Sequence, residues 1–132
     1  MKDCLFCKII NSEIPSEIIY EDKLVLAFLD INPTTNGDTL IIPKKHFQDI
    51  LEIPDDILLH MQKIYQKLYP IYKEKLNCDG LTLSTNLDYG QEIKHMHMHF
   101  IPRYKNDEVK HFSNKDLLKD LKEIKKMLTT NE

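Results

Sequence analysis

The stretch HMHMHFIPR, residues 95–103, decides the fold of this chain, because histidines and apolar residues alternate along it. Alternation with a period of two is typical of a β-strand, whose side chains point to opposite faces of a sheet. We therefore expect one face of this strand to carry His95, His97 and His99, while the apolar residues between them enter a core. Three imidazoles in register suit the binding of phosphate, protons or a metal better than they suit packing.

Strand geometry limits what the three histidines can do together. Alternate residues on a strand lie roughly 6.5 Å apart, so His95 and His99 are expected to be about 13 Å apart. A zinc ion with Zn–N bonds of about 2.0 Å can bind two neighbouring histidines but not all three. The three side chains must therefore have at least two different roles.

The composition is that of one globular domain. The chain has 132 residues, of which 42% are hydrophobic and 30% are charged, and its formal net charge is −3. Without a basic excess we expect no nucleic acid partner, and no apolar run approaches the roughly 20 residues of a membrane span. We see no signal peptide, and an odd count of three cysteines is not typical of a secreted disulfide framework. We therefore expect a cytoplasmic protein without a membrane partner.

Patterns along the chain predict an α+β fold. Apolar residues recur at spacings of three and four between Ile57 and Tyr72, which predicts a long helix that begins at Pro54. Pro70 lies inside this pattern and should kink or split the helix. Because strands outnumber helices and do not alternate with them one for one, we expect a mainly antiparallel sheet. Its strands are predicted at residues 18–21, 24–30, 39–42 and 81–84 and at the histidine stretch.

A second helix is predicted from Ser113 onward. Ser113 and Asp116 have the spacing of a capping box. Lysines lie largely off its apolar stripe, and a basic amphipathic helix can bind a membrane surface or a partner. Acidic residues interrupt the basic charge, so we expect residues 113–132 to pack on the same domain. The stripe consists of Leu117, Leu118, Leu121, Ile124 and Leu128.

Cys4 and Cys7 are separated by two residues, a spacing that lets both thiolates bind one metal ion. We expect no strand before Cys4, which disfavours a redox site of the thioredoxin type. Burial in the first turn of a helix is the alternative. A zinc site needs two further ligands, for which the candidates are His46 and one end of the histidine stretch. Spacing does not choose the end, and Cys78 is expected to serve ordinary packing.

Several motifs in one order resemble the histidine triad (HIT) superfamily and, within it, the Hint-like branch of small nucleotide hydrolases. The motifs are Cys4-x-x-Cys7-Lys8-Ile9-Ile10, residues 27–33, residues 42–46, residues 90–92 and His95-x-His97-x-His99. The resemblance covers about residues 4–104 and implies a HIT domain over residues 1–112. It also implies a five-stranded antiparallel sheet with a long helix, and a homodimer in which two sheets form one of ten strands.

The resemblance further implies that the middle histidine attacks the α-phosphorus of a nucleotide. Carried across, His97 is the nucleophile and His99 binds and neutralises the phosphoryl oxygens. A neutral imidazole is nucleophilic near pH 7, which agrees with this role. Such a hydrolase acts on a purine nucleotide substrate and releases AMP or another mononucleotide from nucleoside phosphoramidates or related conjugates. No catalytic metal is required, because positioning and electrostatics supply most of the catalysis.

Other positions match the nucleotide pocket of the family. Asp30 corresponds to the acid that accepts hydrogen bonds from the ribose hydroxyls. Asn86 belongs to the segment that supplies an asparagine near the phosphate, and Gln91 lies in the loop that reaches the leaving group. Core packing is the alternative interpretation of the apolar matches. These apolar matches, which would form the slot for the base, are Phe6, Ile9, Phe28 and Ile31.

The resemblance also implies one structural zinc ion per chain. In zinc-bearing bacterial relatives, the metal is held by two cysteines, the histidine after Pro-Lys-Lys and the first histidine of the triad. This agrees with the strand geometry, because one histidine serves the metal and two remain for the phosphate. A closed site with four protein ligands is structural. The corresponding residues here are Cys4, Cys7, His46 and His95.

Three positions depart from the family pattern. Asp38 stands where the family usually has a histidine, and an acid there either orients an imidazole or repels phosphate. Ser84 occupies the ungapped position of the phosphate-site asparagine, and residues 92–94 replace a serine near the leaving group. Three alternatives therefore stay open. They are a dinucleoside polyphosphate hydrolase, a nucleotide-binding module with little catalysis, and a metal-dependent enzyme in which His95 and His97 hold a catalytic ion.

Overall fold

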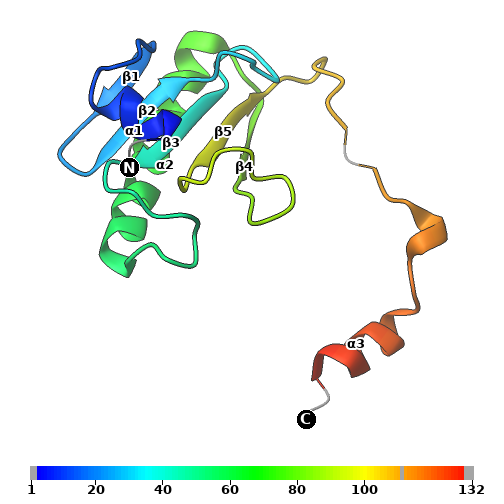
Figure 1. The fold of residues 1–132 in the computed structure, drawn as a ribbon. Helices are drawn as coiled ribbons and strands as arrows, with labels where there is room; N and C mark the ends of the chain where they lie inside the picture. The colour runs from blue at the N-terminus through cyan, green and yellow to red at the C-terminus, as the bar shows by residue number, and fades with distance from the viewer. Residues whose placement is uncertain (1–2, 111, 130–132) are drawn as a thin grey trace.

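The computed structural model describes residues 3–110 and 112–129, and Figure 1 shows their arrangement. The predicted α+β fold is confirmed, with a five-stranded antiparallel sheet, a long helix and a C-terminal helix. The elements follow the chain as α1 (Leu5–Ile10), β1 (Ile18–Glu21), β2 (Val25–Leu29), β3 (Thr39–Pro43), α2 (Asp55–Leu76), β4 (Gly80–Ser84), β5 (Met98–Arg103), the 3-10 helix η1 (Lys115–Leu117) and α3 (Leu121–Thr129).

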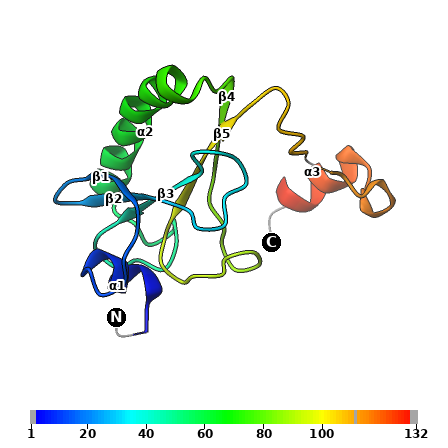
Figure 2. The same cartoon turned by 90° about the horizontal axis from the view of Figure 1, so that it is seen from above.

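The histidine strand is central in the sheet. The strand order is β1-β2-β3-β5-β4, and every neighbouring pair is antiparallel. On β5, His99 is therefore opposite Leu40 of β3 on one side and Ser84 of β4 on the other. Figure 2 shows α2 on one side of the sheet and α1 on the other. The two faces of the central strand thus meet different helices.

Alternating strand residues divide the apolar side chains between two cores. The long helix α2 packs its buried stripe against one face of the sheet, and α1 packs Phe6 and Ile9 against the other. The strand residues that face α2 are Val25, Ala27, Ile41, Met98 and Phe100. Those that face α1 are Leu26, Phe28, Leu40 and Ile42. The period of two on the strands therefore places the histidines on the α1 face.

Of the two outcomes predicted for Pro70, a kink or a split, the split does not occur, because α2 continues through this proline. Pro70 is exposed, whereas Leu68 and Tyr72 on either side of it are buried against the sheet. Because the buried stripe keeps its contacts, packing holds the helix together across the hydrogen bond that proline removes. Neither α2 nor any other helix of the described residues is long and apolar enough to cross a membrane.

The assigned strand β5 begins at Met98, so of the three histidines only His99 lies within it. The predicted alternation nevertheless extends upstream, because Met96 and Phe100 are both fully buried. The ladder between β3 and β5 ends at the pair of Ile41 and Met98. Beyond it the Pro43 carbonyl bonds to the His95 ring, and the Met96 backbone N–H donates to the Phe47 carbonyl. The segment before β5 is therefore anchored partly by its side chains.

The C-terminal helix begins later than predicted. Residues Lys115–Leu117 form the short η1 helix, and α3 starts at Leu121. The Asp120 carboxylate accepts a hydrogen bond from the Lys122 backbone N–H at 3.2 Å, so Asp120 takes the capping position. The prediction of a helix start at Ser113 is therefore wrong.

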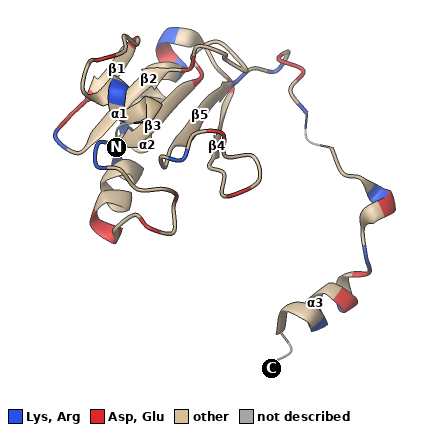
Figure 3. Ribbon diagram, viewed as in Figure 1, with Lys and Arg blue, Asp and Glu red and all other residues tan. Residues whose placement is uncertain are grey.

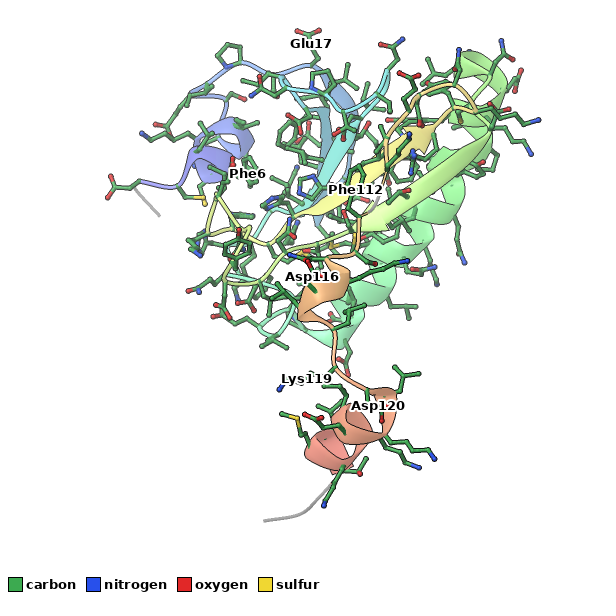
Figure 4. All side chains as sticks on the ribbon, turned by 90° about the vertical axis from the view of Figure 1, so that its right-hand side faces the viewer. Phe6, Glu17, Phe112, Asp116, Lys119 and Asp120 are labelled. Carbon is green, nitrogen blue, oxygen red and sulfur yellow. The ribbon has the colours of Figure 1, made fainter. Side chains whose placement is uncertain are left out.

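Residues 112–129, called here the C-terminal arm, extend away from the sheet (Figure 1). Its exposed apolar residues are Phe112, Leu117, Leu118, Leu121, Met127 and Leu128. Figure 3 shows acidic and basic residues mixed along the arm, and Figure 4 shows Lys119 and Asp120 well away from the sheet. The expected packing of residues 113–132 on the domain is not seen over 113–129, and 130–132 lie outside the described residues. Both sheet faces are already covered, by α1 and α2.

Candidate active site and metal centre

Four side chains from three separate segments meet on the α1 face. Cys4 and Cys7 come from the start of α1, His46 follows β3, and His95 precedes β5. Their ligand atoms all lie within 4.8 Å of one another. The structure therefore brings together all four residues that the family resemblance implied as metal ligands.

The spacing of these four ligand atoms fits a tetrahedral metal ion. The Sγ of Cys4 lies 3.4 Å from Nδ1 of His95, and the Sγ of Cys7 lies 3.4 Å from Nδ1 of His46. The two Nδ1 atoms are 3.1 Å apart. Sulfur and nitrogen ligands at about 2.0–2.3 Å from one tetrahedral ion are separated by roughly 3.3–3.8 Å. Small shifts of the side chains would therefore complete the coordination.

The ring of His95 is held in the orientation that a metal ligand needs. Its Nε2–H donates to the backbone carbonyl of Pro43 at 2.8 Å, which leaves Nδ1 free to face the two thiols. Burial lowers the pKa of His95 to about 4, so the ring is neutral near pH 7. Burial raises the pKa of the Cys7 thiol, and a cation at this point would favour the thiolate.

The start of α1 explains why both cysteines reach the same point. The Sγ of Cys4 accepts a hydrogen bond from the Cys7 backbone N–H at 3.3 Å, which makes Cys4 the N-cap of the helix. Between them Phe6 is buried, and in Figure 4 it lies between α1 and the sheet. The same helical turn therefore supplies two ligands on one side and an aromatic wall on the other.

A cavity of about 400 Å³ lies beside the metal cluster, between α1, the end of β2 and the loop before β5. Its lining includes Ile14, Leu40 and Ile93, which the sequence analysis did not name as binding residues. Ile93 lies between two charged residues in the segment that departs from the family pattern. In the sequence, such an apolar residue is only a weak indication of a cavity wall. Of the predicted binding residues, the lining includes Phe6, Ile9, Phe28, Asp30, Ile31, Asn86, His97 and His99.

The His97 side chain offers one nitrogen to this cavity. Its Nδ1–H donates to the backbone carbonyl of His95 at 2.7 Å, so Nε2 carries the free lone pair. Burial lowers the pKa of His97, which keeps the ring neutral near pH 7. The Phe6 ring packs against the His97 ring in a T-shaped arrangement, with ring centroids 5.0 Å apart. The imidazole is thus fixed, neutral and suited to nucleophilic attack.

The polar end of the cavity holds His99, whose ring centroid lies 5.0 Å from that of His97. Two carboxylates lie near it, those of Asp30 and Asp38, and ligand-type atoms of the three side chains are all within 4.8 Å of one another. Asp30 lines the cavity, and its Oδ1 accepts a hydrogen bond from the Asn32 backbone N–H. Asp38 is buried, which raises the pKa of its carboxyl group.

Comparison with known proteins shows to which family the chain belongs. The HIT domain family matches residues 11–106. This chain belongs to the HIT family. An uncharacterised HIT-like protein of Methanocaldococcus jannaschii is 50% identical over 128 residues, which cover 92% of this chain and 98% of that protein. The adenosine 5′-monophosphoramidase HNT1 of Saccharomyces cerevisiae is 43% identical over 76% of this chain and 62% of the yeast protein.

Solved HIT structures share the fold. The crystal structure of a zinc-bound histidine triad family protein from Mycobacterium smegmatis superposes with a TM-score of 0.78 and 33% identity. The alignment covers 86% of this chain and 84% of that chain. The HIT family match begins after Cys4 and Cys7, so it does not include the two cysteines of the metal cluster.

One predicted residue of this HIT chain lies elsewhere. Gln91 is buried, and its Nε2 donates to the backbone carbonyl of Gln48 at 2.6 Å. It is not among the described residues that line the cavity, whereas Gly90 and Glu92 on either side of it are. A buried amide needs hydrogen-bond partners; the Gln48 carbonyl supplies one for Nε2, whereas Oε1 has none among the described residues. The structure therefore does not place Gln91 with the other predicted binding residues.

Proposed function

We propose that this HIT protein hydrolyses nucleotides at the α-phosphate through a histidine nucleophile, releasing AMP or another mononucleotide from nucleoside phosphoramidates or related conjugates. The geometry of His97 carries this proposal, because its Nδ1–H is bonded to a carbonyl and the ring lines the cavity. The similarity to the yeast adenosine 5′-monophosphoramidase supports it.

In the proposed reaction, Nε2 of His97 attacks the α-phosphorus and the P–N bond breaks. The electron pair goes to the leaving nitrogen, which takes up a proton, and a nucleotidyl-histidine remains. Water then attacks the phosphorus, the bond to Nε2 breaks, and the mononucleotide leaves. His99 binds the phosphoryl oxygens, where electrostatic stabilisation matters most in phosphoryl-type transfer.

The apolar end of the cavity would take the purine base, with Phe6, Ile9 and Phe28 forming its buried wall. Asp30 at the end of β2 would accept hydrogen bonds from the ribose hydroxyls. Ile31 is 89% exposed, so it would contact the base only at the mouth of the cavity. Asn86 would lie near the phosphate.

A structural zinc ion, one per chain, would be held by the two cysteines with His46 and His95. All four ligand positions of a tetrahedral zinc site come from the protein, which leaves no open position for a catalytic role. The zinc-bound relative from Mycobacterium smegmatis supports this assignment. The ion would fix α1 to the segment that carries His97, and so hold one wall of the cavity against the other.

A homodimer with a continuous ten-stranded sheet is also part of the proposal. The edge strands of the sheet are β1 and β4, and an edge strand can pair its backbone with a second copy of the chain. One chain has a mass of 15.6 kDa, and sedimentation equilibrium would give twice this mass if the dimer forms. A monomer at micromolar concentration would contradict it.

The decisive experiment measures AMP release from adenosine 5′-phosphoramidate. His97→Ala should lower kcat by at least about 1,000-fold, because the nucleophile itself is removed. His60→Ala is the matched control, since His60 lies on α2 and pairs with Asp22 outside the cavity. Its kcat should stay within about threefold of the unchanged protein.

Two results would contradict the proposal. Unchanged turnover in a folded His97→Ala protein would exclude the histidine nucleophile. AMP binding by calorimetry without turnover of any conjugate would indicate a nucleotide-binding module instead. Comparing kcat/KM for the phosphoramidate and for a dinucleoside polyphosphate separates the two hydrolase substrates.

A further inference from the structure

Asp38 carries a buried carboxyl oxygen that lacks a partner. The residue precedes β3 and is only 2% exposed. Its Oδ2 accepts a hydrogen bond from the Thr34 backbone N–H at 2.9 Å, but Oδ1 has no hydrogen-bond partner among the described residues. Burying a carboxylate oxygen without a partner is costly, so a group that supplies positive charge is expected beside it.

The polar end of the cavity carries an excess of acidic side chains. Asp30 and Glu92 line the cavity, whereas no lysine or arginine is among the described residues that line it. Burial raises the pKa of the Asp38 carboxyl group, and the charge of Asp30 acts in the same direction, against the Thr34 hydrogen bond. The positive charge that Asp38 lacks is therefore not supplied by a basic side chain of the cavity wall.

Asp30, Asp38 and His99 have the spacing of a cation site. Asp30 directly follows β2, Asp38 directly precedes β3, and His99 lies in β5. The Asp30 backbone N–H donates to the Asp38 carbonyl at 3.0 Å, which holds the two acids side by side. One ligand atom from each of the three side chains lies within 4.8 Å of the other two. Ligands about 2.1 Å from one octahedral ion are about 3–4 Å apart, so shifts of at most about 1 Å would complete the site.

The donor atoms indicate the class of ion. Carboxylate oxygens suit Mg²⁺, Ca²⁺ and Mn²⁺, whereas imidazole nitrogens suit the later first-row transition metals. Two carboxylates with one imidazole therefore favour a divalent first-row ion that accepts both, such as Mn²⁺, over Mg²⁺. The cluster of two thiols and two imidazoles beside α1 favours zinc instead, so the two clusters select different ions.

We propose that Asp30, Asp38 and His99 bind a divalent cation of the Mn²⁺ class at the polar end of the cavity, with its remaining coordination positions open to a phosphate oxygen. The buried, unpartnered oxygen of Asp38 distinguishes this site from a group of solvated surface acids. Asp30 and His99 line the cavity, so a cation that they hold lies at the cavity wall.

The phosphate contact rests on the proposed hydrolase function, which brings an anionic phosphate next to the carboxylates of Asp30 and Glu92. Carboxylates repel phosphate, and a bound dication reverses the sign of the local charge. His99 would then bind the phosphoryl oxygens through the cation. Asp30 can bind the cation and still accept a hydrogen bond from a ribose hydroxyl, because a carboxylate has about four lone-pair positions. The cation adds affinity and no step to the reaction.

The test measures Mn²⁺ binding to the zinc-loaded, nucleotide-free protein through the loss of the electron paramagnetic resonance signal of free Mn²⁺. One Mn²⁺ ion should bind per chain, and Asp38→Asn should weaken its binding at least about tenfold, because one charged ligand is removed. Elemental analysis should find the zinc content unchanged, since thiolates prefer zinc to Mn²⁺.

Asp49→Asn is the matched control. Asp49 is also buried and accepts a backbone hydrogen bond, but it belongs neither to the cavity lining nor to the cation cluster. Its Mn²⁺ affinity should stay within about twofold of the unchanged protein. If Asp38→Asn does not fold, Asp30→Asn takes its place, because Asp30 is only partly buried. That variant should also weaken Mn²⁺ binding at least about tenfold.

NMR of the unchanged protein locates the ion without any substitution. Mn²⁺ at a small fraction of one equivalent should broaden the ring signals of His99. The signals of His60, which pairs with Asp22 outside the cavity, should broaden far less.

AMP affinity separates the cation site from the proposed function. Saturating Mn²⁺ should tighten AMP binding at least about fivefold in the unchanged protein but not in Asp38→Asn. If AMP does not bind under either condition while one Mn²⁺ binds per chain, the cation site stands and the proposed function fails. AMP binding of equal strength with and without Mn²⁺ would overturn the phosphate contact.

Three results would overturn the site itself. Equal Mn²⁺ affinity in the unchanged protein and Asp38→Asn would place the ion on other carboxylates. Equal broadening of His99 and His60 would do the same. An unchanged protein that binds no Mn²⁺ below about 1 mM would show that no divalent cation compensates the buried carboxyl group of Asp38.

Discussion

The histidine site and the C-terminal arm use apolar residues in opposite ways. In the body of the protein, Met96 and Phe100 are fully buried between the sheet and α2. In the arm, Leu121 and Leu128 are 84% and 80% exposed, although they have the spacing of a packed helix. Apolar periodicity therefore specifies a helix or strand face, but only a complementary surface elsewhere in the chain gives that face a place to pack.

The largest contrast is expected in stability. Phe100 packs against the rings of Tyr65 and Tyr72, with the Tyr72 centroid at 5.0 Å. Phe100→Ala should lower the free energy of unfolding by about 3–5 kcal/mol, because it leaves a cavity in the core. Leu128→Ala in the arm should change it by less than about 0.5 kcal/mol. Urea denaturation measures both, and comparable losses would show that the arm is packed in solution.

The metal cluster should be the second strongest contributor. Cys7→Ser removes one ligand and should leave far less than one zinc ion per chain, with a loss of roughly 3 kcal/mol in the free energy of unfolding. Cys78 is buried but is not part of the cluster, which makes Cys78→Ser the matched control. Elemental analysis should find zinc retained in the control. Equal zinc content in both variants would contradict the assigned ligands.

Acid should destabilise the body and not the arm. Burial lowers the pKa of His95 to about 4, and also lowers that of His97. In the unfolded chain these rings bind protons near pH 6.5, so the unfolded state holds more protons between about pH 6.5 and 4. Stability should therefore be present above pH 6.5 and fall as the pH decreases through this window, by about 2–3 kcal/mol for His95.

The measurement is urea unfolding at several pH values between 7 and 4. Residues 112–129 contain no histidine, so a chain without the arm should show the same pH dependence. Zinc strengthens the trend, because a protonated imidazole cannot bind the metal. A stability that is flat over this range would show that neither histidine is buried in its neutral form.

Residues with a local pattern could be predicted from the sequence. The alternation around His97 and the stripe of α2 depend on periods that the chain itself displays, and the structure has both the sheet and the helix. The place of Asp30 has a different origin, because only the family resemblance implied that it belongs to the pocket; in the structure it follows β2 and lines the cavity.

Features that depend on distant contacts could not be predicted in this way. Pro70 is tolerated because the residues beside it are held by the sheet, and Gln91 turns toward a carbonyl from a loop far along the chain. The later start of β5, at Met98 instead of at His95, is another such feature, because the His95 ring bonds to the Pro43 carbonyl of a neighbouring strand. The unpartnered oxygen of Asp38 is likewise visible only when β2, β3 and β5 are assembled.

The smallest effect is expected from removing the arm. A chain that ends before Phe112 loses exposed apolar residues and no contact with the cavity, since none of the described arm residues lines it. The free energy of unfolding should change by less than about 1 kcal/mol, because little apolar area is lost from the folded state. For the same reason kcat/KM should stay within about twofold. A larger fall in activity with unchanged stability would show that the arm contributes to a cavity. Because the arm extends away from the sheet of its own chain, that cavity would belong to a second copy of the chain.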